Sequence, residues 1–166
     1  MTLRKTKEDA MRITKSGTIR SATLATALLL AGGPLVSAHA EETPAAAFWP
    51  AGAEAYIISP KDGATVKSPV TVVFGLKGLG VAPAGVEKAK TGHHHLLIDT
   101  DLPTADELGD PLPADEHHVH FGGGQTQTTV ELAPGKHTLQ LIMGDASHVP
   151  HNPPLASKKI TITVEK

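Results

Sequence analysis

Residues 70–77 read VTVVFGLK, a run in which β-branched and aromatic side chains predominate. Such side chains favour extended backbone, and the run is bounded by Pro69 and Gly78, which interrupt regular structure. Residues 159–165 read KITITVE and alternate apolar with polar side chains, as a strand with one buried face does. Both stretches predict β-strands.

Further strands are expected at residues 55–59, 94–99, 125–132 and 137–143, which are separated by turns rich in Gly and Pro. The predicted fold class is therefore all-β, a small immunoglobulin-like β-sandwich of about seven strands. Residues 58–78 resemble the opening hairpin of bacterial immunoglobulin-like modules. Residues 132–143 and 158–164 resemble their closing strands. This likeness implies a fold and no function.

The first 40 residues have the three parts of a secretion signal. Residues 1–20 carry six basic side chains, residues 22–36 are almost wholly apolar, and residues 37–40 read SAHA, with small side chains where a signal peptidase cuts. The apolar run is shorter than the roughly 20 residues that span a membrane. We therefore expect cleavage after Ala40, a periplasmic or secreted protein, and no membrane span after cleavage.

Residues 41–54 are expected to form a flexible lead-in, and residues 55–166 a single β-sandwich domain. Residues 41–166 hold nine Lys, no Arg and fifteen Asp and Glu, a net charge of −6 with His neutral. This excess of negative charge disfavours nucleic acid as a partner. The chain has no cysteine, which excludes disulfides and thiolate chemistry.

All nine histidines of residues 41–166 fall between residues 93 and 151. In an extended strand, residues two apart face the same side. His93 and His95 therefore form one potential chelating pair, and His118 and His120 form another. If the two segments are neighbours in the sandwich, four imidazoles are able to reach one ion.

A third pair of histidines lies in the proline-rich loop before the last expected strand, and a turn at residues 149–152 would bring its two members close. His94 points away from its two neighbours if the segment is extended, so it is a reserve candidate only. The metal-ligand candidates are His93, His95, His118, His120, His148 and His151, with His94 in reserve.

The available donor atoms restrict the kind of ion. Residues 41–166 offer imidazoles, carboxylates and one methionine, Met143, which suits Cu(II), Zn(II) or Ni(II) better than Cu(I). Intrinsic affinity puts Cu(II) first. Five carboxylates beside the histidines are candidates either for fixing the imidazole tautomers or for binding the ion themselves: Asp99, Asp101, Asp115, Glu116 and Asp145.

Two further motifs have structural interpretations. His137 occupies the position of a corner residue that bonds back to the backbone in immunoglobulin-like modules. Residues 122–124 are three glycines, which lack the Lys-Ser/Thr ending of a phosphate loop. We expect them to form a bulge or tight turn beside a crowded site.

Several of these segments together resemble a family of small exported bacterial domains of unknown function. The segments are GHHHLLID at residues 92–99, HFGGGQT at residues 120–126 and PGKHTLQL at residues 134–141, with His148 and His151 in a proline-rich loop. The resemblance implies an exported β-domain whose histidine motifs belong together. It supplies no activity.

The sequence thus favours an exported, histidine-rich transition-metal-binding domain with a chaperone, buffer or sensor role for copper or zinc, and no enzymatic activity. The catalytic alternative is a metal-dependent hydrolase or oxidase, which needs three ligands and an open position. The alternative of another class is a non-catalytic envelope interaction module. Such a module would bind a protein or cell-wall polymer, and its histidines would be structural or pH-sensing.

Overall fold

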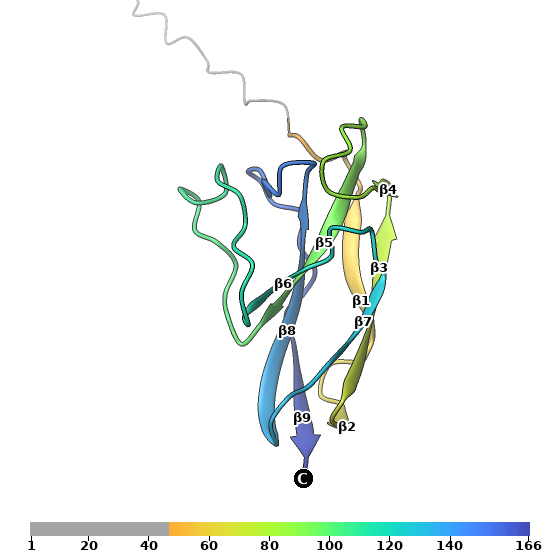
Figure 1. The fold of residues 1–166 in the computed structure, drawn as a ribbon, viewed down its shortest axis with the longest axis vertical. Helices are drawn as coiled ribbons and strands as arrows, with labels where there is room; N and C mark the ends of the chain where they lie inside the picture. The colour runs from red at the N-terminus through yellow and green to blue at the C-terminus, as the bar shows by residue number, and fades with distance from the viewer. Residues whose placement is uncertain (1–46) are drawn as a thin grey trace, which may run out of the picture. The chain divides into compact units, whose positions relative to one another are not determined.

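The computed structural model describes residues 47–166 (Figure 1). The expected secretion signal (1–40) and the lead-in up to residue 46 lie outside the described residues. Within the described part no helix occurs, and so none is long and apolar enough to cross a membrane. The strands are β1 (Glu54–Ser59), β2 (Thr65–Lys67), β3 (Val70–Lys77), β4 (Gly80–Val81), β5 (Thr91–Ile98), β6 (His118–His120), β7 (Gln127–Val130), β8 (Gly135–Gly144) and β9 (Ile160–Glu165).

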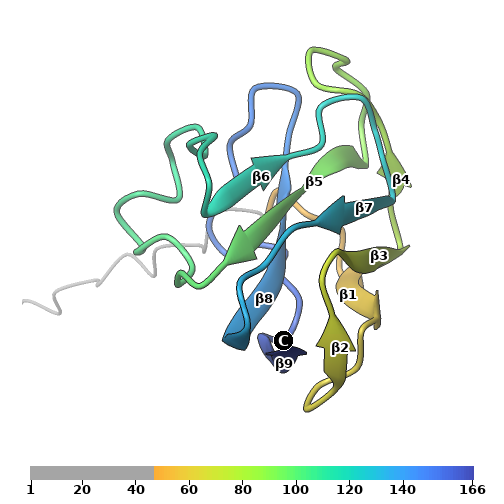
Figure 2. The same cartoon turned by 60° about the horizontal axis from the view of Figure 1, so that its bottom comes forward.

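These strands form two sheets, which confirms the all-β prediction (Figure 2). The smaller sheet has the order β1-β3-β7, and the larger has the order β2-β9-β8-β5-β4, with β6 paired to the edge of β5. All six strands expected from the sequence are present. The structure adds β2, β4 and β6, which have only two or three residues each and are too short to show a periodic pattern.

One apolar core joins the two sheets. Alternate residues of β3 in the smaller sheet face alternate residues of β5, β8 and β9 in the larger one. The alternation of apolar and polar side chains at residues 159–165 therefore corresponds to one buried face of β9. The buried members of this core are Val70, Val72, Phe74, Leu96, Ile98, Phe121, Leu139, Leu141, Ile160, Ile162 and Val164.

The outer face of the larger sheet is covered as well. Leu97 of β5 and Ile142 of β8 pack there against Leu112, which lies in the loop between β5 and β6. The backbone N–H of Leu112 donates to the carbonyl of His148 at 3.0 Å, and this bond ties that loop to the one after β8. From residue 92 on, every residue of β5 is consequently buried.

A residue that precedes β1 also packs into the domain. Trp49 is buried against Ala55, Met143 and Leu155. Its indole Nε1 donates to the carbonyl of Pro150 at 2.7 Å. The segment before the first strand is thus anchored on the loop that follows β8.

A carboxylate–imidazole pair joins the end of β5 to the start of β8. Asp99 accepts a bond from the backbone N–H of Thr138 at 2.7 Å and one from His137 Nδ1 at 2.6 Å, while His137 Nε2 donates to the carbonyl of Ala133 at 2.8 Å. Both ring nitrogens face acceptors, an arrangement that favours the imidazolium form of His137. Burial opposes this charge, but the hydrogen bonds to Asp99 and Ala133 and the charge of Asp99 together outweigh it and raise the pKa of His137. His137 bonds back to the backbone, as predicted.

Replacing His137 by Gln should destabilise the protein by about 1.5–3 kcal/mol, the usual value of a hydrogen bond to a charged group. Because the pKa of His137 is raised on folding, this stabilisation is complete below about pH 6.5 and is lost as the pH rises through the folded value. The melting-temperature gap between wild type and His137→Gln should therefore be large near pH 6 and small near pH 9. A gap that grows with pH would contradict the assignment.

Candidate metal centre

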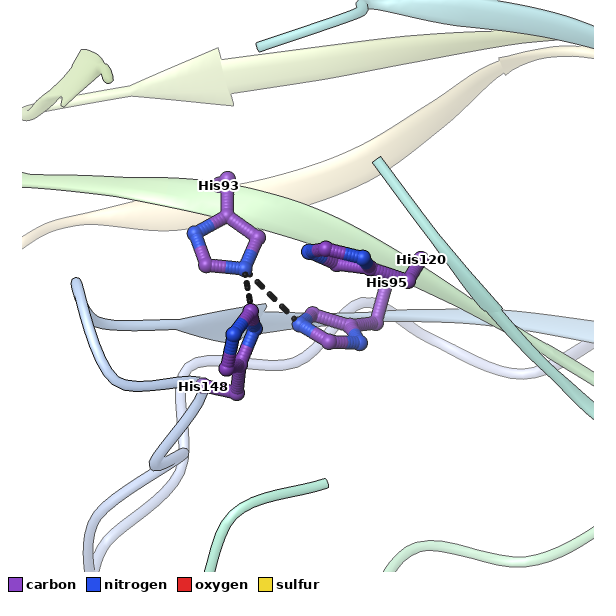
Figure 3. Close-up of side chains that lie close together, drawn as sticks. All are labelled: His93, His95, His120 and His148. Carbon is purple, nitrogen blue, oxygen red and sulfur yellow. Dashed lines mark hydrogen bonds between the residues drawn. The ribbon is translucent and has the colours of Figure 1, made fainter. Parts of the chain in front are cut away.

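Four imidazole rings from three separate segments converge on one point (Figure 3). His93 and His95 belong to β5, His120 to β6, and His148 to the loop after β8. Each ring offers one nitrogen, and these nitrogens all lie within 4.8 Å of one another. His93 Nε2 is 3.1 Å from His95 Nε2 and 3.1 Å from His148 Nδ1.

Strand register brings the rings together. In the antiparallel ladder of β5 and β6, His95 lies opposite His120. On the other side of β5, His93 lies opposite Gly144, the last residue of β8. The chain leaving β8 therefore starts its loop beside His93, and four residues later it supplies His148.

Two glycines leave the space that the rings occupy. A Cβ atom on Gly144 would lie 2.9 Å from His95 Nε2 and 3.2 Å from the Cα of His148. A Cβ atom on Gly122 would overlap the ring of His120. The residues after His120 turn tightly beside a crowded cluster, as predicted for the glycine run at 122–124.

Burial keeps the rings of His93 and His95 neutral at neutral pH. Burial, together with the charges of the neighbouring rings, lowers the pKa of His95 to about 3 and that of His93 to about 4. Burial also lowers the pKa of His120. Neutral imidazole is the form that binds a metal ion, because it has a free lone pair.

Three nitrogens of the cluster lack a hydrogen-bond partner among residues 47–166: Nδ1 of His93, Nδ1 of His95 and Nε2 of His120. Each unpartnered buried group costs about 1–3 kcal/mol. A tetrahedral ion with bonds of about 2.0–2.1 Å would hold its ligand atoms about 3.3–3.4 Å apart. Two pairs of ring nitrogens, both 3.1 Å apart, lie near that spacing, and all four lie within 4.8 Å of one another, so these residues fit a bound metal ion.

Comparison with known proteins places the chain in a family. A model described as a domain of unknown function, DUF4399, matches residues 72–165. The chain belongs to the DUF4399 family. The match spans all four clustered histidines and bears out a resemblance to a family without an established function. No match was found among curated proteins or solved structures.

Three of the seven candidate ligands in the DUF4399 domain lie outside the cluster: His94, His118 and His151. His94 points into the core, where its ring centroid lies 5.2 Å from that of Phe74. Burial lowers the pKa of His94 to about 4; the backbone of Gln125 partly offsets this, although neither ring nitrogen of His94 makes a regular hydrogen bond. His118 lies opposite Leu97, two pairs further along β5 than His120.

Hydrogen bonds to neighbouring carboxylates engage the other two candidates outside the cluster, His118 and His151. Asp115 accepts a bond from His118 Nδ1 at 2.8 Å, and Asp145 accepts one from His151 Nε2 at 2.8 Å. Within the described residues, none of the five carboxylates is hydrogen-bonded to a ring of the cluster. Asp115 and Asp145 each stand three to six residues before their histidine, a local pattern that the sequence did contain.

Without metal, the three buried rings of β5 should stay neutral down to about pH 4. Unfolded imidazoles take up protons near pH 6.5, whereas His93 and His95 do so near 4 and 3 when folded. Protons therefore bind the unfolded chain preferentially, and stability should fall as the pH drops below about 6.5. Histidine NMR titration with chelator present measures the midpoints. Midpoints near pH 6.5 for these rings would show that they are hydrated.

Proposed function

We propose that this DUF4399 protein is an exported transition-metal-binding protein that holds one ion between His93, His95, His120 and His148. The observation that carries the proposal is a group of four imidazoles whose ligand nitrogens lie within 4.8 Å of one another, two of them on fully buried rings. Burying polar rings is unfavourable unless their polar atoms find partners. A metal ion would be bound by the nitrogens that face one another, Nε2 of His93, Nε2 of His95 and Nδ1 of His148 together with one nitrogen of His120, and these ligand bonds would offset part of that cost.

The arrangement of the rings favours Zn(II). Five of the six ring-centroid distances lie between 4.6 and 5.0 Å, and the sixth, between His95 and His148, is 5.9 Å. A square of ligands would have two diagonals about 1.4 times the edges, whereas the ligands of a tetrahedral Zn(II) site are equally spaced. Cu(II) has the higher intrinsic affinity but prefers a tetragonal site.

The number of ligands supports holding an ion rather than catalysis. Catalytic zinc sites keep a position open for water, whereas four side chains close a tetrahedral shell. His93 and His95 are fully buried, while His120 and His148 are half-buried. An ion would therefore enter and leave past His120 and His148, as a chaperone, buffer or sensor requires.

The test is thermal unfolding of the protein, purified without an affinity tag, in Zn(II), Cu(II), Ni(II) or chelator. Binding to the folded state alone stabilises it by about 2.7 kcal/mol when the free ion is at 100 times its Kd. The melting temperature should rise most with Zn(II), and chelator should reverse the rise. Acidification should abolish it, since the ion competes with protons for the rings.

A matched pair of variants tests which histidines bind. His118 and His120 lie two residues apart on β6, and only His120 belongs to the cluster. His120→Gln should lose most of the Zn(II)-dependent rise, while His118→Gln should keep it. Equal losses in both variants would contradict the four-residue site. A wild-type protein that no metal stabilises would overturn the proposed function and favour the interaction module.

A further inference from the structure

His148 is held differently from the other three candidate ligands. Those three lie on strands, whereas His148 lies in a loop and has a φ of 69°, which is unusual for a residue other than glycine. The left-handed conformation costs such a residue roughly 1–2 kcal/mol. Something outside the strand ladders must therefore hold the loop in place.

The carboxylate of Asp145 organises this loop. Its Oδ1 accepts bonds from the backbone N–H groups of Ser147 at 2.7 Å and Val149 at 3.0 Å, on either side of His148. Two backbone bonds close the same turn, from His148 N to the Asp145 carbonyl at 3.0 Å and from Asp145 N to the Val149 carbonyl at 3.1 Å. These bonds fix the backbone on both sides of the ligand.

The second oxygen of Asp145 connects the turn to the segment ahead of β1. Oδ2 accepts the bond from His151 Nε2, and the His151 ring stacks on Phe48 with centroids 3.5 Å apart and planes 9° apart. Trp49 meets the edge of His151 and donates to the carbonyl of Pro150. We call Asp145, His151, Phe48 and Trp49 the brace.

We propose that the brace positions His148 as the fourth ligand, so that residues 48–49 take part in metal binding although they precede β1. This inference rests on the proposed function. The brace residues are positioning residues, because their hydrogen bonds reach the loop backbone and His151 and none reaches a ring of the cluster. The competing explanation is that the charge of Asp145 attracts the cation directly.

A double-mutant cycle separates the two explanations. Zn(II) affinity is measured by competition with a chromophoric chelator for wild type, Asp145→Asn, His148→Gln and the double variant. Loss of a group that orients a ligand weakens metal binding by about 10–100-fold. Asp145→Asn should do so in the wild-type background and should have no further effect once His148 is absent. A charge effect would persist in the His148→Gln background.

Asp99→Asn is the matched control. Asp99 also accepts one backbone N–H and one imidazole, but it lies about 13 Å along the strand from His95. This variant should lower thermal stability and leave Zn(II) affinity unchanged. Phe48→Ala repeats the test without touching a charge, and because Phe48 is 51% exposed the variant should fold. It should weaken binding only when His148 is present.

Histidine NMR gives a second measurement. In wild type, Zn(II) should shift the rings of all four clustered histidines, and in Asp145→Asn only those on β5 and β6. Equal weakening by Asp145→Asn in both backgrounds, or none in either, would overturn the brace while leaving the metal site intact. A wild-type protein that binds no ion overturns the proposed function itself, and this result appears before any variant is made.

Discussion

Burial of β5 on both faces is the constraint from which the rest of the structure follows. The smaller sheet covers one face, and the loops after β5 and β8 cover the other. Three consecutive histidines in such a strand have no route to water, so their rings stay neutral and several nitrogens lack partners. Alternation sends His94 to the apolar core and His93 and His95 together to the outer face. The cost of burying the latter two is what a bound ion would offset.

The same ladders that close the larger sheet also assemble the site. Pairing of β5 with β6 sets His120 beside His95, and pairing of β5 with β8 sets Gly144 beside His93. Three ligands are thus fixed by backbone hydrogen bonds that the sheet needs in any case. Only the fourth depends on a loop, which is shaped by backbone hydrogen bonds, by the carboxylate of Asp145 and by contacts with the aromatic side chains ahead of β1. Three ligands are therefore positioned by strand pairing and the fourth by the contacts of a loop.

Local pattern was sufficient to predict the strands with regular alternation and the corner role of His137. Alternation along a strand also predicted that His93 and His95 face the same side and that His94 faces the other. His118 lies outside the cluster because its ring is hydrogen-bonded to Asp115 in a turn that strand alternation does not take into account. His151 lies outside it because its ring bonds to Asp145, six residues earlier, and stacks on Phe48, which is about a hundred residues earlier and meets it only after folding. The pairing register of the strands and the packing of Trp49 depend on residues far apart in the sequence, so no local periodicity predicts them.

The charge of the site bears on its proposed role. Imidazole ligands bind through an uncharged lone pair and leave the charge of a divalent ion uncompensated, and a buried uncompensated charge is unfavourable. The charge of Asp145 acts on His93, where it opposes the lowering of the pKa, but the oxygens of Asp145 are engaged by His151 and the loop backbone. Such a site binds less tightly than one in which carboxylates or thiolates supply charge. Weaker binding of this kind and a half-buried ligand on a loop would both favour release, which supports the proposed carrier or buffer role over a permanent structural centre.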